Sequence, residues 1–294
     1  MMRRLREVIE TGEFAVTVEC EPPKGTDVTT VLSRTKALLG RVHGINVTDN
    51  QAAVMRMSSL AMCRLLFEQG HDPVFQMTTR DRNRLALQSD LLGAHALGIR
   101  NVLCLRGDDP SVGDHKDAKP VFDLDAAQLL GVVGQLNEGK DLGGHTLSGS
   151  TDFFPAAAVS PEMDPPEPQL AGMERKLKSG AKFFQTQAVY NPDRFRAFME
   201  RARPLGARVL AGIVVLKSAK MAEYMNKNIP GISVPQHFIE ELASADKEQA
   251  LGVGIDIAVR LIKQIRDCCH GVHIMAVGSD QAIPAILDRA ELGA

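Results

Sequence analysis

The sequence is poor in tryptophan, tyrosine and cysteine. It has no tryptophan and two tyrosines among 294 residues. Its five cysteines are scattered and include no Cys-x-x-Cys pair: Cys20, Cys63, Cys104, Cys268 and Cys269. This odd, unpatterned set argues against a disulfide framework and against a zinc or iron–sulfur site. We therefore expect no metal in this chain.

Long apolar runs and an excess of one charge are also missing. No run approaches the roughly 18 apolar residues of a membrane span, and no apolar stretch follows the basic segment 1–6 as a secretory signal requires. The 34 basic and 36 acidic residues nearly cancel, to a net charge of −2. Nucleic-acid and anionic-membrane binding are disfavoured by this balance, and we expect a cytoplasmic protein.

One pattern recurs along the chain: a short, β-branched apolar run, a polar cluster, and a longer stretch with helical periodicity. The predicted strands are 14–20, 44–49, 73–79, 101–107, 153–159, 183–189, 208–215 and 272–278. Helices are predicted over 85–97, 125–136, 169–179, 192–203 and 255–268, with a further helical insertion over 235–245. Two segments, 140–151 and 161–168, are predicted to be loops because of their glycine and proline content.

Alternating strands and helices favour parallel strands joined by right-handed crossovers. Eight such units predict a single (β/α)8 TIM barrel, an α/β fold, that occupies residues 1–294 as one catalytic domain. The alternative is an open sheet of six or seven strands. The absence of Gly-x-Gly-x-x-Gly after the first strand weakens a dinucleotide-binding version of that alternative.

Polar residues concentrate where the predicted strands end, which is where such barrels carry their active sites. Glu19 lies inside the apolar first strand, a position that suits a general acid. The alternative is a structural ion pair from Glu19 to Arg80 or Arg106. Gln185 and Gln187 lie two apart on the sixth strand, so both are predicted to face the lumen. His273, in the eighth strand, is expected to be a core residue rather than a base.

The fourth strand ends in Arg106-Gly107-Asp108. The glycine permits close approach of a ligand to the backbone, and the arginine suits a phosphate. A strand-end turn with a surface ion pair explains the same residues equally well.

Several segments resemble one family, the methylenetetrahydrofolate reductases. The first-strand stretch 18–23 (VECEPP) is similar to that family's Phe-Glu-Phe-Phe-Pro-Pro motif, and the stretch 98–108 (GIRNVLCLRGD) resembles its fourth-strand segment. Arg175-Lys176, Thr186-Gln187 and Gly212-Ile213 resemble later blocks. The matches run in order over about residues 14 to 280, and the barrel of that family agrees with the eight predicted strands.

The resemblance implies three catalytic residues. Glu19 corresponds to the glutamate that protonates the folate and opens its five-membered ring. Asp108 corresponds to the aspartate between flavin and folate, whose negative charge disfavours the anionic reduced flavin. Gln187 corresponds to the glutamine that contacts the pterin and the nicotinamide in turn. Hydride would pass from flavin N5 to the methylene carbon of 5,10-methylenetetrahydrofolate and give 5-methyltetrahydrofolate.

The resemblance also implies a cofactor site for FAD. Its expected residues are Thr48, Gln76, Arg106, Gly107, Asp108, Ala157, Arg175 and Lys176, with the last two near the flavin phosphates.

This chain departs from the family at several positions. Gln76 replaces a common histidine, Gly172 replaces an asparagine near the flavin phosphate, and Ala219 replaces an aromatic residue that packs on NADH and folate. The tyrosine of the family's Tyr-Pro-Glu stretch after the fifth strand is missing, with Val159-Ser160-Pro161-Glu162 in its place. FMN in place of FAD therefore remains an alternative. The electron donor is NADH, NADPH or a partner redox subunit, and we expect a homo-oligomer or a component of a complex with tetrahydrofolate as its substrate.

Two other functions remain open at this stage. One is a pterin-dependent methyltransferase barrel, which needs no flavin. The other is a non-catalytic subunit that binds folate or flavin within a redox complex. The presence of both Glu19 and Asp108 favours the flavin-dependent reductase.

Overall fold

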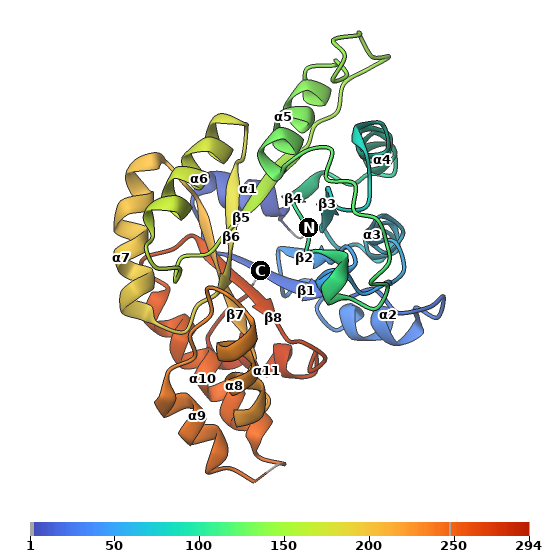
Figure 1. The fold of residues 1–294 in the computed structure, drawn as a ribbon. Coiled ribbons are helices and arrows are strands. Elements are labelled where there is room, and N and C mark those ends of the chain that lie inside the picture. The colour runs from blue at the N-terminus through green and yellow to red at the C-terminus, as the bar shows by residue number, and fades with distance from the viewer. Residues whose placement is uncertain (1–2, 247, 294) are drawn as a thin grey trace.

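Eight parallel strands close into a barrel in the computed structural model, which describes residues 3–246 and 248–293 (Figure 1). Each strand pairs with its neighbours in sequence order, and the eighth pairs with the first. The strands are β1 Ala15–Cys20, β2 Gly44–Val47, β3 Pro73–Thr78, β4 Asn101–Leu105, β5 Phe154–Val159, β6 Phe183–Ala188, β7 Val209–Val214 and β8 Gly271–Met275. The closed barrel confirms the predicted fold class and excludes the open sheet.

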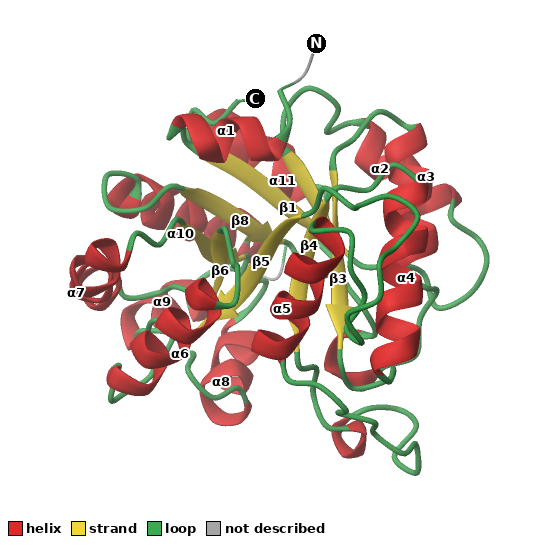
Figure 2. Cartoon of the chain, turned by 90° about the horizontal axis from the view of Figure 1, so that it is seen from above, coloured by secondary structure: helices red, strands yellow, loops and turns green. Residues whose placement is uncertain are grey.

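Helices surround the barrel on its outside (Figure 2). The α-helices are α1 Leu5–Thr11, α2 Thr29–Lys36, α3 Ser59–Glu68, α4 Arg84–Ala96, α5 Ala126–Asn137, α6 Glu167–Lys178, α7 Pro192–Ala202, α8 Ala219–Asn228, α9 Gln236–Ala243, α10 Ala250–Ile265 and α11 Ala282–Arg289. Short 3-10 turns lie at η1 Gln51–Ala53, η2 Pro110–Val112 and η3 Arg203–Leu205. None of the helices in the described part of the chain has the length and apolar character needed to cross a bilayer.

The predicted boundaries differ from the observed ones mainly at strand ends. The second and fourth strands were predicted to reach residues 49 and 107 but end at Val47 and Leu105. The prediction of a loop over 161–168 was wrong for its last two residues, because α6 begins at Glu167 and contains Pro168. Proline is accepted in a first helical turn, where its missing N–H has no partner to lose.

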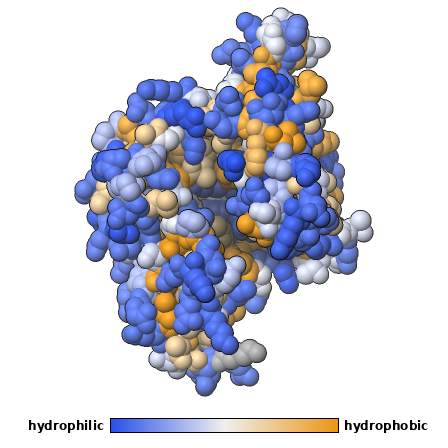
Figure 3. All heavy atoms as spheres, viewed as in Figure 1, coloured by the Kyte–Doolittle hydropathy of each residue, from blue (hydrophilic) through white to orange (hydrophobic). Residues whose placement is uncertain are grey.

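The amino-terminal end of the barrel is closed by apolar side chains. Leu5, Val8 and Ile9 of α1 are at most 1% exposed, and they pack against lumen residues at the beginnings of the strands, such as Phe154 and Phe183. The Leu5 N–H donates to a carboxylate oxygen of Asp72 at 2.9 Å, which fixes the start of the helix. Figure 3 shows a hollow in the middle of the opposite face, toward which the strands run, so the lumen is open at their carboxyl ends.

A polar layer lies above this apolar floor, because side chains two apart on a strand share a face. Asn46 of β2 and Gln185 of β6 exchange two amide hydrogen bonds across the lumen, at 2.6 and 3.0 Å. Thr17 of β1 lies 3.0 Å from His273 of β8, measured from Oγ1 to Nδ1. All four residues are buried, so the paired polar groups fix the lumen in one arrangement.

Candidate active site

Glu19 faces the lumen from the carboxyl-terminal half of β1. Its side chain is 11% exposed, and its Oε2 lies 3.9 Å from Nε2 of His273. The other carboxylate oxygen accepts a hydrogen bond from the amide of Gln51 at 3.5 Å. The predicted alternative, an ion pair to Arg80 or Arg106, is wrong, because these side chains engage other groups. Glu19 is thus a carboxyl group at the carboxyl-terminal end of the lumen, called the mouth below, with an imidazole and an amide beside it.

His273 has a larger place in the site than the sequence indicated. It is 3% exposed, as predicted for a core residue. Its Nδ1 meets Thr17, however, and its Nε2 faces the Glu19 carboxyl group. The ring therefore lies between the buried polar layer and Glu19, 3.9 Å from its carboxyl group.

Asp108 and Arg106 lie beyond the end of β4 and are exposed. The guanidinium carbon of Arg106 lies 4.0 Å from the ring centroid of Phe122, a cation–π geometry. Gly107 has φ = +85°, and a Cβ there would lie 3.1 Å from the Cβ atoms of Thr78 and Arg80. The glycine is therefore needed for close approach to the end of β3, in addition to the approach to a ligand that the sequence suggested.

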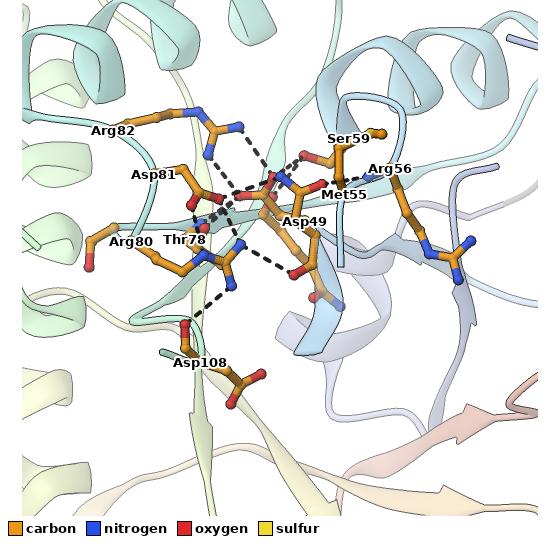
Figure 4. A network of polar contacts seen from close by, with 12 residues as sticks. Asp49, Met55, Arg56, Ser59, Thr78, Arg80, Asp81, Arg82 and Asp108 are labelled. Carbon is orange, nitrogen blue, oxygen red and sulfur yellow. Dashed lines mark hydrogen bonds and ion pairs between the residues drawn. The ribbon is translucent and has the colours of Figure 1, made fainter. Parts of the chain in front are cut away.

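Arg80 connects the loops after β2, β3 and β4. Its side chain is 3% exposed and donates twice to the Asp81 carboxylate, at 2.7 Å each. It also donates to the backbone carbonyls of Asn50, at 3.2 Å, and Asp108, at 3.4 Å. Figure 4 shows the guanidinium between Asp81 and the Asp108 carbonyl. One side chain therefore positions both the loop that carries Gln51 and the loop that carries Asp108.

Asp49 is the centre of a second buried cluster, next to Arg80 in Figure 4. Its Oδ2 accepts from the N–H and the hydroxyl of Thr78, both at 2.9 Å, and from Arg82 at 2.8 Å. Its Oδ1 accepts from Ser59 at 3.4 Å. Asp49 is the last residue of the predicted strand 44–49, and its role in joining β2 to β3 depends on contacts between segments that are distant in sequence.

The segment between β2 and α3 has an unusual backbone. Asn50, Ala52 and Ala53 have φ values of 47°, 53° and 55°, although none is glycine. Such conformations cost free energy and persist only where neighbouring groups impose them. The Arg80 contact to Asn50 and the bond from Arg56 N–H to Asn50 Oδ1, 2.9 Å, supply that constraint. Gln51, which contacts Glu19, belongs to this strained segment.

Thr48 and Gln76, two of the residues expected to bind the cofactor, lie at the lumen mouth. Thr48 is 1% exposed, and its hydroxyl has no hydrogen-bond partner among the described residues. Gln76 is 7% exposed, and its backbone carbonyl accepts from Ser59 at 3.2 Å. A buried hydroxyl without a partner is costly unless a ligand completes it. Ala157 differs, because it is buried in the core between the strands and the outer helices, with its side chain away from the lumen.

Arg175 and Lys176 lie on α6, apart from the Glu19 mouth. Arg175 pairs with Asp125, the residue before α5, at 3.0 Å. The Lys176 ammonium donates to the carbonyl of Ala158 in β5 at 2.7 Å. Burial lowers the pKa of Lys176, and the nearby Arg175 charge acts in the same direction. The two cations thus lie on the side of the barrel formed by α5, α6 and β5, where each is engaged by an oxygen atom of the chain.

Gln187 lies at the end of β6, where the pairing with β7 is irregular. Its side-chain oxygen accepts from the Ala188 N–H at 3.2 Å, and the side chain is partly exposed. Gly212 of β7 accommodates the irregularity, since a Cβ there would lie 2.4 Å from the Thr186 carbonyl oxygen. Gln187 is therefore at the mouth, while Gln185 is committed to the buried pair with Asn46.

Exchanging Arg80 for lysine should loosen both loops that it connects. Lysine keeps the charge but lacks the planar fork that serves Asp81 and the carbonyls together. We expect backbone hydrogen exchange to rise about tenfold or more in residues 50–57 and 106–115, from the loss of charge-assisted bonds of roughly 1.5–3 kcal/mol. Arg84→Lys is the matched control, because Arg84 forms an exposed pair with Asp123. Equal exchange in the two variants would contradict the role assigned to Arg80.

These features define a class: a (β/α)8 barrel whose open end carries an acidic residue, amide groups and a hydroxyl that has no partner within residues 3–246 and 248–293. Within the described residues, no group of three or more His, Cys, Asp or Glu side chains is placed to hold a metal ion. The chain belongs to the methylenetetrahydrofolate reductase family, whose model matches residues 4–291.

Individual relatives agree with this assignment. Methylenetetrahydrofolate reductase 2 of Schizosaccharomyces pombe is 24% identical over 98% of this chain and 47% of its own length. Methylenetetrahydrofolate reductase (NADH) 1 of Arabidopsis thaliana is 28% identical over 65% of this chain and 33% of its own. The chain thus spans less than half the length of these curated relatives.

A solved structure has the same fold. It is an uncharacterized protein from Clostridium thermocellum that binds two copies of 5-methyl-5,6,7,8-tetrahydrofolic acid. The TM-score is 0.69, with 16% identity and coverage of 97% of each chain.

Proposed function

We propose that this protein reduces 5,10-methylenetetrahydrofolate to 5-methyltetrahydrofolate with a bound flavin. The observation that carries the proposal is the arrangement of Glu19, which lies at the lumen mouth between His273 and Gln51. Membership of the reductase family supports it, and so does the fold shared with a protein that binds methyltetrahydrofolate.

The residues at the mouth fit a flavin. The Thr48 hydroxyl, which has no partner in the part of the chain that the structure describes, offers a hydrogen bond, and Gln76 and the Arg106-Gly107 backbone lie on the neighbouring strand ends. Arg175 and Lys176 would neutralise flavin phosphates on the α5–α6 side. When bound, the flavin supplies the hydride. Ala157 would contribute through its backbone alone, because its side chain faces the outer core.

The residues of this chain then have separate tasks. Because the product keeps its carbon on N5, the bond that breaks is the one from the methylene carbon to N10, and N10 takes a proton. Glu19 delivers that proton, and His273 and Gln51 hold its carboxyl group in place. Gln187 orients the pterin through its amide. The negative charge of Asp108 disfavours accumulation of anionic reduced flavin, which favours hydride release.

Purification followed by visible spectroscopy tests this function. We expect flavin absorbance, released FAD or FMN on chromatography, and reoxidation of the dithionite-reduced protein by methylenetetrahydrofolate. NADH, NADPH and a candidate redox subunit are then compared as donors, since the donor is either a nicotinamide nucleotide or such a partner. A colourless protein that binds neither FAD nor FMN, yet binds folate, would refute the reductase and favour a methyltransferase.

A further inference from the structure

The loop after β4 is docked on the strained segment between β2 and α3. Asp114 of this loop accepts a hydrogen bond from the backbone N–H of Met55, 3.0 Å from its Oδ1. The same oxygen lies 2.9 Å from Nδ1 of His115, and Oδ2 accepts from the ammonium of Lys24, in the loop after β1. One carboxylate therefore joins the loops that follow three different strands.

Gly113 brings the two backbones into contact. A Cβ at this position would lie 1.9 Å from the carbonyl oxygen of Ala53 and 2.8 Å from the Cβ of Ala53. Because these distances are shorter than any contact between non-bonded atoms, only glycine permits this approach. Ala53 is one of the strained residues, with φ = 55°. The docked loop thus lies directly against the strained backbone.

The charge of Asp114 favours the docked arrangement. Hydrogen bonds from Lys24, His115 and the Met55 N–H hold the pKa of Asp114 below its ordinary value, so the carboxyl group is ionised at neutral pH. Hydrogen bonds to an ionised group are stronger than those between neutral groups. The Asp114 side chain is only 25% exposed, which limits screening by salt. Asp114 is therefore an effective point of attachment between the loops.

The two docked loops carry groups of the proposed site. Gln51 belongs to the strained segment, and its amide donates to Glu19 at 3.5 Å. Asp108 lies in the same loop as Asp114, between β4 and α5. Arg80 reaches both loops from the end of β3, through their carbonyl groups. Asp114 differs from Arg80 because it joins the two loops directly to each other.

From these contacts we infer that Asp114 is a positioning residue for the reaction, because it fixes the loop of Asp108 against the segment of Gln51 before the folate binds. The inference rests on the proposed function. Asp114 has no part in the chemical steps proposed above, so it acts through the loops. When only a fraction of a protein has the binding-competent arrangement, its apparent affinity falls by that fraction. Undocked loops should therefore weaken folate binding, and bound folate should restore the docked state and the rate of the chemical step.

Asp114→Ala and Gly113→Ala test the inference by two routes. The first removes the acceptor, and the second forces the backbones apart while the carboxylate stays. We expect each variant to weaken binding of 5-methyltetrahydrofolate to the flavin-loaded protein about tenfold in calorimetry. The KM for methylenetetrahydrofolate should rise by a similar factor with kcat unchanged. Hydrogen exchange of the backbone in residues 50–57 should increase in both variants, and this readout does not depend on activity.

Asp114→Asn is the conservative variant, because its side-chain oxygen still accepts from the Met55 N–H. Its affinity and exchange should lie between those of Asp114→Ala and the unaltered protein. Two matched controls should change neither quantity. Asp117→Ala removes an exposed carboxylate from the same loop, and Gly131→Ala adds a Cβ on α5, where no atom lies within 4 Å.

A role in stability alone would lower the amount of active protein and leave KM unchanged. That result, or unchanged exchange in Asp114→Ala and Gly113→Ala, would overturn the inference and leave the proposed function intact. If the unaltered protein binds neither flavin nor folate, the proposed function fails, and the role of Asp114 in the reaction fails with it.

Discussion

Replacing Glu19 with glutamine is expected to slow the folate-dependent step by a factor of about 10²–10⁴, the usual contribution of a positioned general acid. The amide keeps the size of the side chain and its place beside His273 and Gln51, but it cannot deliver a proton to N10. Flavin content and the rate of flavin reduction by the donor should stay within a few-fold of the unaltered protein. Stopped-flow measurement of the two half-reactions separates these effects.

Glu13→Gln is the control for this variant, because it makes the same change near the opposite end of β1, where Glu13 pairs with Arg3 on the surface. It should leave both half-reactions unaltered. If Glu19→Gln turned over methylenetetrahydrofolate at an unchanged rate, the proton would have to come from elsewhere, and the assignment of Glu19 as the acid would be wrong. Retained binding of 5-methyltetrahydrofolate would show that the loss is chemical.

Asp49→Ala should lower the free energy of unfolding by about 2–4 kcal/mol. The substitution leaves the buried Thr78 groups without their acceptor and removes one carboxylate from Arg82. Loss of one partner from a buried ion pair costs roughly 3–5 kcal/mol, and the remaining bond of Arg82 to Asp90, 2.8 Å, reduces that figure. Denaturant titration of the purified proteins measures the change.

The matched variant is Asp90→Ala, which removes the other partner of Arg82. The Asp90 side chain is 36% exposed, so its loss should cost at most about 1 kcal/mol. A loss of similar size in both variants would mean that Asp49 contributes no more than a surface ion pair. The difference between them measures the buried share of the cluster.

The barrel could be predicted from the sequence because the patterns that indicate its strands and helices are local. Eight short apolar runs recur, helical periodicity is evident after five of them, and each such segment indicates its own structure without knowledge of the others. The strand ends were harder to predict. Asp49 and Gly107 follow extended segments, but they leave the ladder to meet Thr78 and Arg80, which are distant in sequence.

The candidate site could be predicted only in part. Glu19 stood out as a carboxylate in an apolar strand, a local anomaly. Arg80 and the strained segment at Asn50 gave no such signal, because their roles depend on carbonyl groups contributed by other loops. The outward direction of Ala157 was hidden as well, since the three consecutive alanines of residues 156–158 show no alternation between polar and apolar faces.

The apolar floor made by α1 determines how ligands enter and leave the barrel. With Leu5, Val8 and Ile9 filling the far end, the barrel has no through-passage at that end. A ligand that reaches Glu19 along the lumen must therefore enter and leave at the carboxyl-terminal end of the barrel. If the reductant and the folate both bind through this opening, one must be released before the other binds. The two then bind in alternation, and an excess of either slows binding of the other.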